Sequence, residues 1–290
     1  MEFVVSRQNA LFIRSVYRAC LDREPDAIGW NYFIRGLSNR TMCWDDVLRA
    51  VLNSEEFPLK QRLRESVGPA LQSLHESRMM LVQQHLPPAD RVVDLGGASD
   101  QDPEGALFAM GYPHLPRELL IIDLPPQDRF TRPKTEVSQV VQAARGTRIE
   151  YCFRSMSDLV FLSASSTDLV FSAQSIEHVA EQEADEICTQ VFRILKPGGH
   201  FCLDTPNARL TRLQSPTQLI HPEHKKEYYV SELRKKLTER CFQIIKELGI
   251  NPMPHSIATQ RFDYGEMIQN KCLSDDAESG YCFYIDAVKS

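Results

Sequence analysis

Two glycines follow an acidic residue at the end of a short apolar run near residue 92. The run is Val92–Leu95; it contains Asp94 and leads directly into Gly96, Gly97 and Ala98. Glycines let the backbone turn sharply and let a ligand approach it closely. After the first strand of a doubly wound sheet, such a turn lies where ligands bind. A carboxylate here would complement a ligand cation, although a purely structural strand-to-helix turn produces the same pattern.

A second acid, Asp123, lies near the end of the apolar run Glu118–Leu124. An acid at the end of a second strand accepts hydrogen bonds from ribose hydroxyls, and the alternative is an ordinary acid that opens a proline turn. The two acids together also suit a nicotinamide cofactor. The glycines lack Gly-x-Gly-x-x-Gly spacing, however, and no Tyr-x-x-x-Lys pair follows the fourth strand. A nicotinamide oxidoreductase is therefore the lowest-ranked of three hypotheses.

Three histidines are candidates for proton transfer, namely His178, His221 and His224. An imidazole titrates near neutral pH and takes a proton from an attacking hydroxyl effectively. Each also has a simpler explanation. His178 would be a helix-start residue bonded to the backbone, and the other two would belong to a solvated loop.

Strands that alternate with helical stretches account for the region from about residue 89 onward. This alternation indicates βαβ units and a mostly parallel sheet. The closing strands could form an antiparallel pair at the edge. We therefore predict an α/β, Rossmann-like fold. The expected strands are 91–95, 118–124, 148–153, 169–172, 200–204, 242–246 and 280–289.

The residues before this region have helical periodicity. Apolar residues recur at helical spacing in three segments of residues 7–57, and Pro58 is expected to mark the end of the third helix. A connecting helix should follow and end at Pro87. The predicted parts are a small helical domain at 1–57, a connecting helix at 58–88 and an α/β domain at 89–290.

Composition and charge exclude several classes of protein. The chain of 290 residues has a net charge of −6 and therefore lacks the broad positive field of a non-specific nucleic-acid binder, so we expect no nucleic-acid partner. No run is apolar enough for a membrane helix, and no signal peptide is visible. The eight cysteines form no Cys-x-x-Cys pair, which argues against a structural zinc site and for a reducing compartment. We expect a cytoplasmic protein without a membrane span.

Four blocks in a fixed order resemble class I S-adenosylmethionine-dependent methyltransferases. They are the glycine turn, Asp123, the block Asp168–Val179 (Asp-Leu-Val-Phe-Ser-Ala-Gln-Ser-Ile-Glu-His-Val) and Leu195–Gly199 (Leu-Lys-Pro-Gly-Gly). The resemblance covers about residues 80–290. Within the family, the chain is similar to the small-molecule and glycan-modifying group that includes ubiquinone-biosynthesis O-methyltransferases. It implies a seven-stranded sheet with a C-terminal antiparallel hairpin, and S-adenosyl-L-methionine as the cofactor.

The resemblance also implies a role for each matching position. The glycine turn with Asp94 would hold the methionine and ribose portion of the cofactor, and Asp123 would bind the ribose hydroxyls. The residues at the end of the third strand would flank the adenine, and those at the end of the fourth strand would lie near the reacting methyl group. Many relatives have Asp at the position of Ser155, so this chain lacks one possible hydrogen bond to the adenine amino group. The implied cofactor-binding residues are Asp94, Gly96, Gly97, Ala98, Asp123, Leu124, Ser155, Met156, Ala173 and Gln174.

The same resemblance bears on metal binding. Some relatives hold a divalent cation with Glu-x-x-Glu-His on the loop after the fourth strand, and here that motif begins with Gln174 and ends with Glu177-His178. The loss of one carboxylate weakens the binding of a hard cation. We therefore expect no metal, although His224 leaves a softer site open.

The first segment resembles a short helical domain of undefined activity that occurs in bacterial surface and glycan-related proteins, and it is similar to phycobilisome linker modules. Such domains usually have Gly where Asp22 stands. The segment contains no catalytic constellation, so a docking or structural role is expected, with a protein partner. The matching stretches are Val16–Arg18, Leu21–Asp26, Gly29–Trp30, Tyr32 and Asn53–Phe57.

The leading functional hypothesis is an O-methyltransferase that acts on a hydroxyl of a sugar or small molecule in bacterial glycan biosynthesis. Loops similar to Asp204–Asn207 and His221–His224 cap the acceptor pocket in bacterial glycan methyltransferases. The three histidines are the candidate catalytic bases. The second hypothesis is a non-catalytic cofactor-binding protein that retains the fold, because Ser155 and Gln174 depart from the common pattern.

Overall fold

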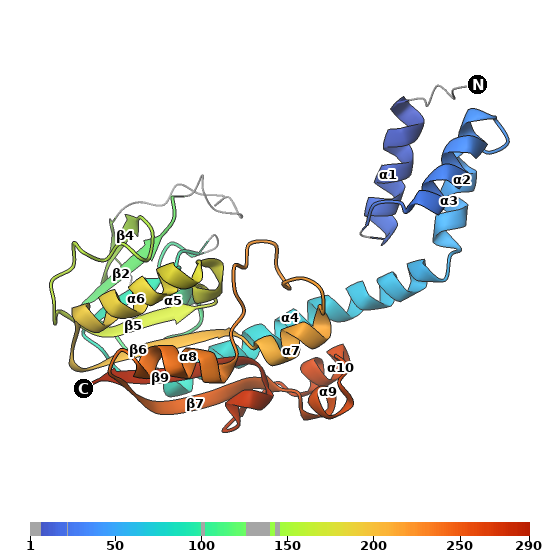
Figure 1. The fold of residues 1–290 in the computed structure, drawn as a ribbon. Coiled ribbons are helices and arrows are strands. Elements are labelled where there is room, and N and C mark those ends of the chain that lie inside the picture. Colours follow the sequence, from blue (N-terminus) through green and yellow to red (C-terminus); the bar gives the residue numbers. More distant parts are fainter. Residues whose placement is uncertain (1–6, 22, 100–101, 126–139, 143–145) are drawn as a thin grey trace. The chain divides into compact units, whose positions relative to one another are not determined.

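A computed structural model describes residues 7–21, 23–99, 102–125, 140–142 and 146–290 of the chain (Figure 1). Asp22, the position at which the helical domain usually has Gly, lies outside the described residues. The chain divides into two compact units, Met1–Pro69 and Ala70–Ser290. The division falls inside the helix α4 (Glu56–His85), in the segment expected to connect two domains.

All described elements of the first unit are helices, namely α1 (Arg7–Leu21), α2 (Ala27–Ser38), α3 (Trp44–Leu52) and the first part of α4. The expectation that Pro58 ends the third helix is wrong. That helix ends at Leu52, and Pro58 lies in the first turn of α4, where the missing N–H has no intrahelical partner to lose. The core residues of this unit are Ile13, Val16, Tyr17, Leu21, Phe33, Ile34, Leu37, Val47 and Val51.

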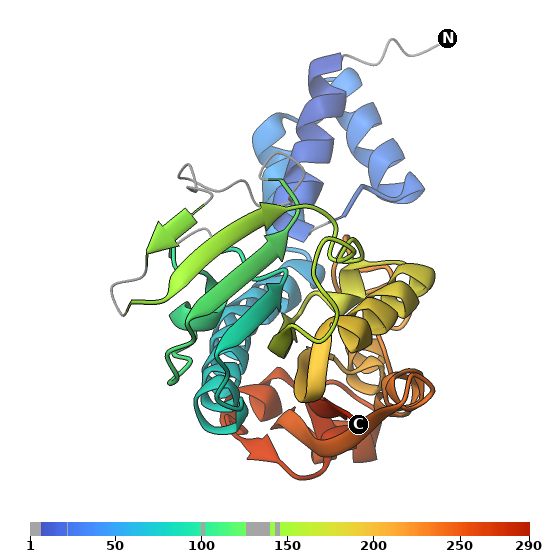
Figure 2. The same ribbon diagram turned by 90° about the vertical axis from the view of Figure 1, so that its left-hand side faces the viewer.

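The second unit is built on one mixed sheet, with the strand order β3-β4-β2-β1-β5-β6-β9-β7-β8 in its described part (Figure 2). The strands β4, β2, β1, β5 and β6 run parallel, whereas β3, β9 and β8 pair antiparallel with their neighbours. The strands are β1 (Arg91–Leu95), β2 (Glu118–Asp123), β3 (Val140–Gln142), β4 (Arg148–Phe153), β5 (Thr167–Ala173), β6 (Leu195–Pro206), β7 (Phe242–Pro252), β8 (Leu273–Ser274) and β9 (Gly280–Lys289).

The α/β architecture and the closing antiparallel pair agree with expectation, but the strand count does not. The described sheet has nine strands instead of seven, because the short strands β3 and β8 extend its two edges. The last strand does not form an edge hairpin. It lies between β6 and β7 and pairs antiparallel with both.

Successive strand residues point to opposite faces of this sheet, and helices cover both faces. Val93 and Leu95 pack in one core with α6 and α8, whereas Val92 packs in the other core with α4 and α5. Asp94 is therefore a carboxylate on a strand that is otherwise committed to apolar packing. The remaining elements are α5 (Ala106–Ala109), η2 (Ile176–His178), α6 (Glu181–Ile194), α7 (Ala208–Gln214), α8 (Val230–Thr238), α9 (Pro254–Thr259), α10 (Tyr264–Gln269) and η3 (Ala277–Ser279).

The five parallel strands all present their carboxyl ends at one edge of the sheet, where ligands bind in folds of this class. The predicted cofactor residues follow β1, β2, β4 and β5 and therefore reach the same edge. No helix in the described part of the chain is both long and apolar enough to cross a membrane.

Candidate cofactor site and histidine cluster

Asp94 is the most unusual residue at this edge. Its side chain is buried, and within the described residues neither carboxylate oxygen has a hydrogen-bond partner. Burial, together with the nearby charge of Asp123, raises the pKa of Asp94 to about 8, although the backbone N–H of Leu107 acts in the opposite direction. An unpaired buried carboxylate is costly, because water no longer solvates it. The position therefore suits a ligand that brings a positive charge and hydrogen-bond donors.

The glycines after β1 are required by the close packing of the turn. Gly96 has φ +76°, a conformation that disfavours a side chain, and a Cβ there would lie 2.8 Å from the Cβ of Ser175. A Cβ on Gly97 would overlap the carboxylate of Asp94. The turn thus keeps backbone atoms and a buried acid next to open space.

That open space is a cavity of about 460 Å³. Five of the predicted cofactor residues line it, namely Asp94, Gly96, Gly97, Ala173 and Gln174. The cavity lies at the ends of β1 and β5. Its size falls within the range of small-molecule sites.

Asp123 supports the turn from the neighbouring strand. Its Oδ2 accepts a hydrogen bond of 3.1 Å from the amide of Ala98, and its Oδ1 accepts one of 2.7 Å from the amide of Leu124. The carboxylate is only partly buried, whereas the side chain of Leu124 is exposed. Asp123 therefore lies beside the glycine turn at the site predicted for a ribose.

The segment after β4 lies next to β2. The amide of Arg154 donates a hydrogen bond of 2.9 Å to the carbonyl of Asp123. The hydroxyl of Ser155 forms a hydrogen bond of 2.8 Å with that of Ser157, and Met156 packs against the apolar core. The described lining of the cavity includes neither Ser155 nor Met156, so these two residues lie farther along the same edge.

The sequence reasoning missed an ionic network in the wall of the cavity. Asp204, at the end of β6, is buried and accepts hydrogen bonds of 2.8 Å from Nε of Arg78 and 2.7 Å from Nε2 of Gln174. The backbone of Gln174 has φ +50°, and its amide donates to the carbonyl of Asp204 at 2.8 Å. Asp204 was noted within a loop motif, but Arg78 carried no signal, because it is one of several arginines on a long helix.

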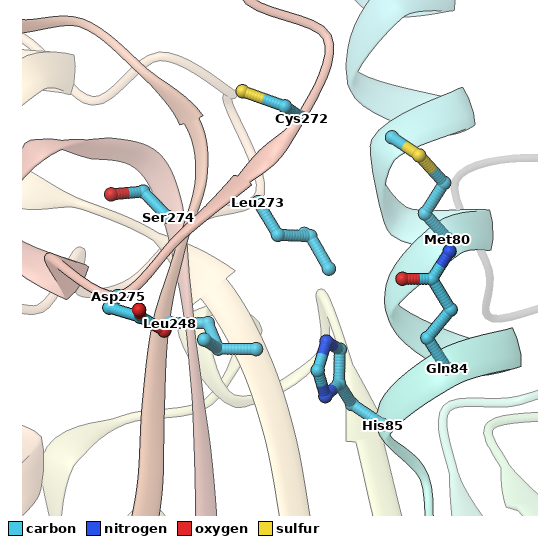
Figure 3. Close-up of a pocket in the computed structure, with 8 residues that line it drawn as sticks. All are labelled: Met80, Gln84, His85, Leu248, Cys272, Leu273, Ser274 and Asp275. Carbon is cyan, nitrogen blue, oxygen red and sulfur yellow. The ribbon is translucent and has the colours of Figure 1, made fainter.

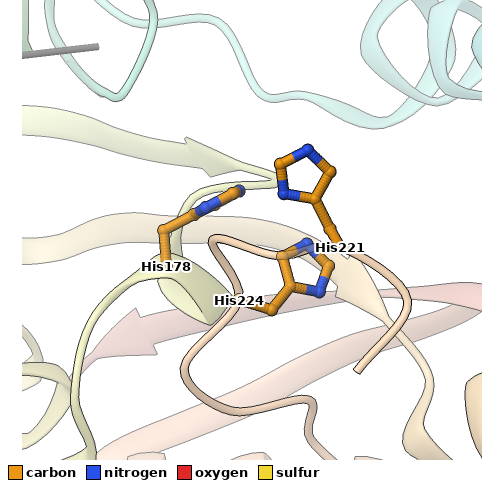
Figure 4. Close-up of side chains that lie close together, drawn as sticks. All are labelled: His178, His221 and His224. Carbon is orange, nitrogen blue, oxygen red and sulfur yellow. The ribbon is translucent and has the colours of Figure 1, made fainter. Parts of the chain in front are cut away.

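The three predicted histidines do come together, as Figure 4 shows. The ring centroid of His178 lies 4.9 Å from that of His224 and 5.8 Å from that of His221, and the last two are 5.3 Å apart. His178 ends the short helix η2 after β5, whereas the other two belong to the segment between α7 and α8. We call these residues the histidine cluster.

Two buried glutamates adjoin the histidine cluster. Oε1 of Glu227 lies 2.8 Å from Nδ1 of His224, and its Oε2 accepts a bond of 2.6 Å from the hydroxyl of Thr211. Oε2 of Glu177 accepts a bond of 2.9 Å from the hydroxyl of Thr205, and its Oε1 has no hydrogen-bond partner in the described structure. From the sequence, Glu177 was considered only as part of a possible metal-binding motif, and Glu227 was not singled out.

The electrostatics of the cluster favour uncharged imidazole at His178. Burial, followed by the neighbouring rings of His224 and His221, lowers the pKa of His178. A neutral imidazole has a lone pair that accepts a proton. The cluster is therefore chemically able to deprotonate a hydroxyl.

The histidine cluster and the cofactor cavity are joined through two short segments. Gln174, which lines the cavity, precedes His178 by one turn of chain. Asp204 contacts the cavity wall through Arg78, and the next residue, Thr205, bonds to Glu177. An acceptor that binds against the cluster would thus lie next to the Gln174 end of the cavity.

A second cavity of about 380 Å³ lies between α4 and the strands β7 and β8 (Figure 3). Met80 and His85 contribute from the helix, and Leu248 and Leu273 from the strands. None of the predicted site residues lines it. This cavity is away from the carboxyl ends of the parallel strands and contributes no chemistry to the site.

Comparison with protein-family models gives two matches. Residues 118–203 match a methyltransferase domain, and residues 3–60 match a domain of unknown function (DUF4214). The first match covers β2, β3, β4, β5 and most of β6, and the second covers α1, α2, α3 and the start of α4. The segment expected to resemble a helical domain of undefined activity is thus matched by a domain whose activity is undefined.

Two curated relatives are methyltransferases by description. A probable S-adenosylmethionine-dependent methyltransferase of Mycolicibacterium smegmatis is 32% identical over 107 residues, 37% of this chain and 40% of the relative. A ubiquinone biosynthesis O-methyltransferase of Xanthomonas axonopodis pv. citri is 30% identical over 152 residues, 51% of this chain and 58% of the relative. The chain thus spans about half the length of the curated relatives it matches.

The solved structures agree on the fold. A Thermotoga maritima methyltransferase, described as a possible histamine N-methyltransferase, superposes with a TM-score of 0.51 at 15% identity, covering 80% of this chain and 96% of that protein. The second unit therefore has the class I S-adenosylmethionine-dependent methyltransferase fold. The cofactor that these matches imply is S-adenosyl-L-methionine. Its ammonium group fits the buried, unpaired carboxylate of Asp94.

Proposed function

We propose that this chain transfers a methyl group from S-adenosylmethionine to a hydroxyl of a sugar or related small molecule. The observation that carries the proposal is the buried carboxylate of Asp94, which lies without a partner in the described structure at a glycine turn in a cavity. The cofactor is a cation with an ammonium group at one end. It would supply the charge and the donors that Asp94 lacks.

The remaining cofactor contacts follow the edge of the sheet. Arg78 lines the cavity and uses Nε for Asp204, so its terminal nitrogens would bind the cofactor carboxylate. Asp123 would accept the ribose hydroxyls, and Ser155 and Met156 would flank the adenine. The predicted set of cofactor residues is thereby retained, with Arg78 added to it.

The histidine cluster would serve the acceptor. Bound S-adenosylmethionine would supply its methyl group to the acceptor oxygen and would leave as S-adenosylhomocysteine. The hydroxyl proton passes to an imidazole of His178, His221 or His224. The lowered pKa of His178 supports this role, because a protonated imidazole accepts nothing.

The class of acceptor is supported less directly than the cofactor. Oxygen as the attacking atom is supported by the likeness to a ubiquinone biosynthesis O-methyltransferase. A glycan acceptor in a bacterium is supported by the resemblance of the first unit to domains of glycan-related proteins, and that unit would dock a protein partner. All eight cysteines are free, which supports a cytoplasmic location.

Transfer of a labelled methyl group tests this function. The full chain is incubated with S-adenosylmethionine and a panel of sugar precursors and small hydroxyl compounds, and products are identified by mass spectrometry. The proposal expects O-methylated product whose rate falls by 10²–10⁴-fold in His178→Ala. Cofactor binding without transfer to any acceptor would instead favour a non-catalytic binding protein.

A further inference from the structure

We propose that the histidine cluster is a binding site for one divalent cation of the zinc class. One nitrogen from each of His178, His221 and His224 can be chosen so that all three lie within 4.8 Å of one another. In a tetrahedral site with Zn–N distances of about 2.0–2.1 Å, the nitrogens are about 3.3 Å apart. Small movements of the rings would therefore close the cluster around an ion.

From the sequence we expected no metal, with a softer site at His224 left open, because a different set of ligands was judged. That set began at Gln174, an amide in place of a carboxylate, and was judged for a hard cation. The structure instead brings two histidines of one loop to a third from another element (Figure 4). Three imidazoles are the donor set of a borderline-soft ion such as Zn²⁺ and leave a fourth position open. With an ion bound, the imidazole lone pairs are coordinated, so a hydroxide at the fourth position would take the acceptor proton in place of an imidazole.

The carboxylate of Glu227 contacts the ring of His224, as the carboxylates that orient metal-binding histidines do. Glu227 contacts Nδ1 of His224 at 2.8 Å and is itself held by Thr211 at 2.6 Å and by the amide of Ile220 at 2.9 Å. A carboxylate on Nδ1 fixes the proton there, which leaves the Nε2 lone pair for a metal. The ring of His224 is thus oriented before any ion arrives.

The balance of buried charge around the cluster favours a cation. Glu177 and Glu227 are both buried, and within the described residues neither forms an ion pair with a lysine or an arginine. Oε1 of Glu177 has no hydrogen-bond partner among the same residues. Buried carboxylates are normally paired or adjacent to a metal. A dication held by three neutral imidazoles would compensate both of them.

The three ligands should not contribute equally. Nδ1 of His221 accepts a hydrogen bond of 3.2 Å from the amide of Glu223. Coordination through Nε2 of His221 would place a proton on Nδ1 and break this bond, whereas His224 is already in the tautomer that binds metal. We therefore expect His221→Ala to weaken the site less than His224→Ala.

The experiment measures metal binding by the full chain alone, without cofactor or acceptor, so that it is independent of methyl transfer. Chelator-treated protein is titrated with zinc chloride and with cobalt chloride, and bound metal is quantified by mass spectrometry after gel filtration. One equivalent per chain is expected. His178→Ala and His224→Ala should weaken binding at least tenfold, and Glu227→Gln about 10–100-fold.

Two histidines outside the cluster serve as controls. His255 is exposed, so His255→Ala should leave binding unchanged. His200 belongs to another set of potential ligands, with Cys202 and Asp286, so His200→Ala tests that alternative. Loss of metal in His200→Ala with retention in His178→Ala would overturn the proposal, and so would a wild-type chain that binds no ion.

The cobalt spectrum tests the proposal without any substitution, which covers the case of variants that do not fold. Three nitrogens and a water should give the visible bands of tetrahedral cobalt without a thiolate charge-transfer band. A thiolate band would place the ion at Cys202 and contradict the assignment. Circular dichroism of each variant separates lost ligands from lost fold.

Discussion

A buried carboxylate without a partner lowers the stability of the protein that contains it, and Asp94 is such a group. Its pKa of about 8 in the folded chain lies well above its ordinary value of 3.8. Between these values the folded state holds a proton that the unfolded state has released. The free energy of unfolding therefore falls as pH rises through this window. The group that causes this loss is neutral below its raised pKa in the ligand-free protein and would ionise when a cationic ligand binds.

Replacement of Asp94 by Asn should separate stability from ligand binding. The neutral amide removes the loss above pH 4, so we expect the ligand-free variant at pH 8 to be more stable by at least about 1 kcal/mol, a rise in Tm of about 2–4 °C. Differential scanning calorimetry at pH 5 and pH 8 checks this, since the gain should shrink at pH 5. A variant less stable than wild type at pH 8 would show that Asp94 has a partner in the folded chain.

Gly97→Ala should disrupt the same turn by overcrowding it. The new methyl group would overlap the carboxylate of Asp94, so we expect a loss of about 1–3 kcal/mol in stability and at least tenfold weaker cofactor binding. Thermal unfolding and calorimetric titration measure the two effects. Gly68→Ala is the control, because its Cβ would meet no atom within 4 Å. Equal behaviour of the two variants would mean that the turn is not closely packed.

Residue types alone predicted only part of the site. The sequence pointed to Asp94, Gly96 and Gly97 because an acid followed by glycines at a strand end suits a ligand, and the three residues line one cavity, whereas their role toward the cofactor stays a prediction. Arg78 was not, because its function depends on which strand end its helix passes. That His221 lies close to His178 was not predictable either, because His221 belongs to the segment between α7 and α8, which follows β6.

At the scale of elements, the parallel strands were predictable because each is a short apolar run bounded by turns. The strand β3 has three residues and β8 has two, too few for any periodic signal. The position of β9 between β6 and β7 was not predictable either, because the order of strands is decided by packing between distant parts of the chain. The proline signal at residue 58 was misread for a local reason, because a proline in the first turn of α4 looks the same in the sequence as one that ends α3.

In the first unit, one ion pair holds the loop after α1 to the start of α4. Nε and a terminal nitrogen of Arg23 bind the two carboxylate oxygens of Glu56 at 2.8 and 2.7 Å. The pair is about one-third exposed, so we expect Arg23→Ala to lower the stability of this unit by only about 1 kcal/mol.

Both tryptophans of the chain, Trp30 and Trp44, belong to the first unit, so tryptophan fluorescence during urea unfolding reports this unit alone. Arg49→Ala, at an exposed position of α3, is the control for loss of a surface arginine. If Arg23→Ala and Arg49→Ala shifted the midpoint equally, the ion pair would contribute nothing.

At the scale of the whole molecule, the chain consists of two units with separate cores. All described residues that line the cofactor cavity lie between His75 and Gln174, within the second unit. A fragment of residues 70–290 should therefore bind S-adenosylmethionine with a Kd within about threefold of that of the full chain. A threefold change in Kd corresponds to less than about 1 kcal/mol of binding free energy. Calorimetric titration of both proteins checks this, and a loss above tenfold would assign part of the site to residues 1–69.

The binding of S-adenosylmethionine to the full chain is the most direct test of the site. Isothermal titration calorimetry at pH 8 should show saturable binding of one cofactor per chain, and Asp94→Asn, although more stable, should bind at least tenfold more weakly. Affinity of the wild type should also rise from pH 6 to pH 8, because the cofactor's ammonium binds the ionised form of Asp94. Absence of saturable binding, or equal affinity in Asp94→Asn, would contradict a cofactor site built on this carboxylate.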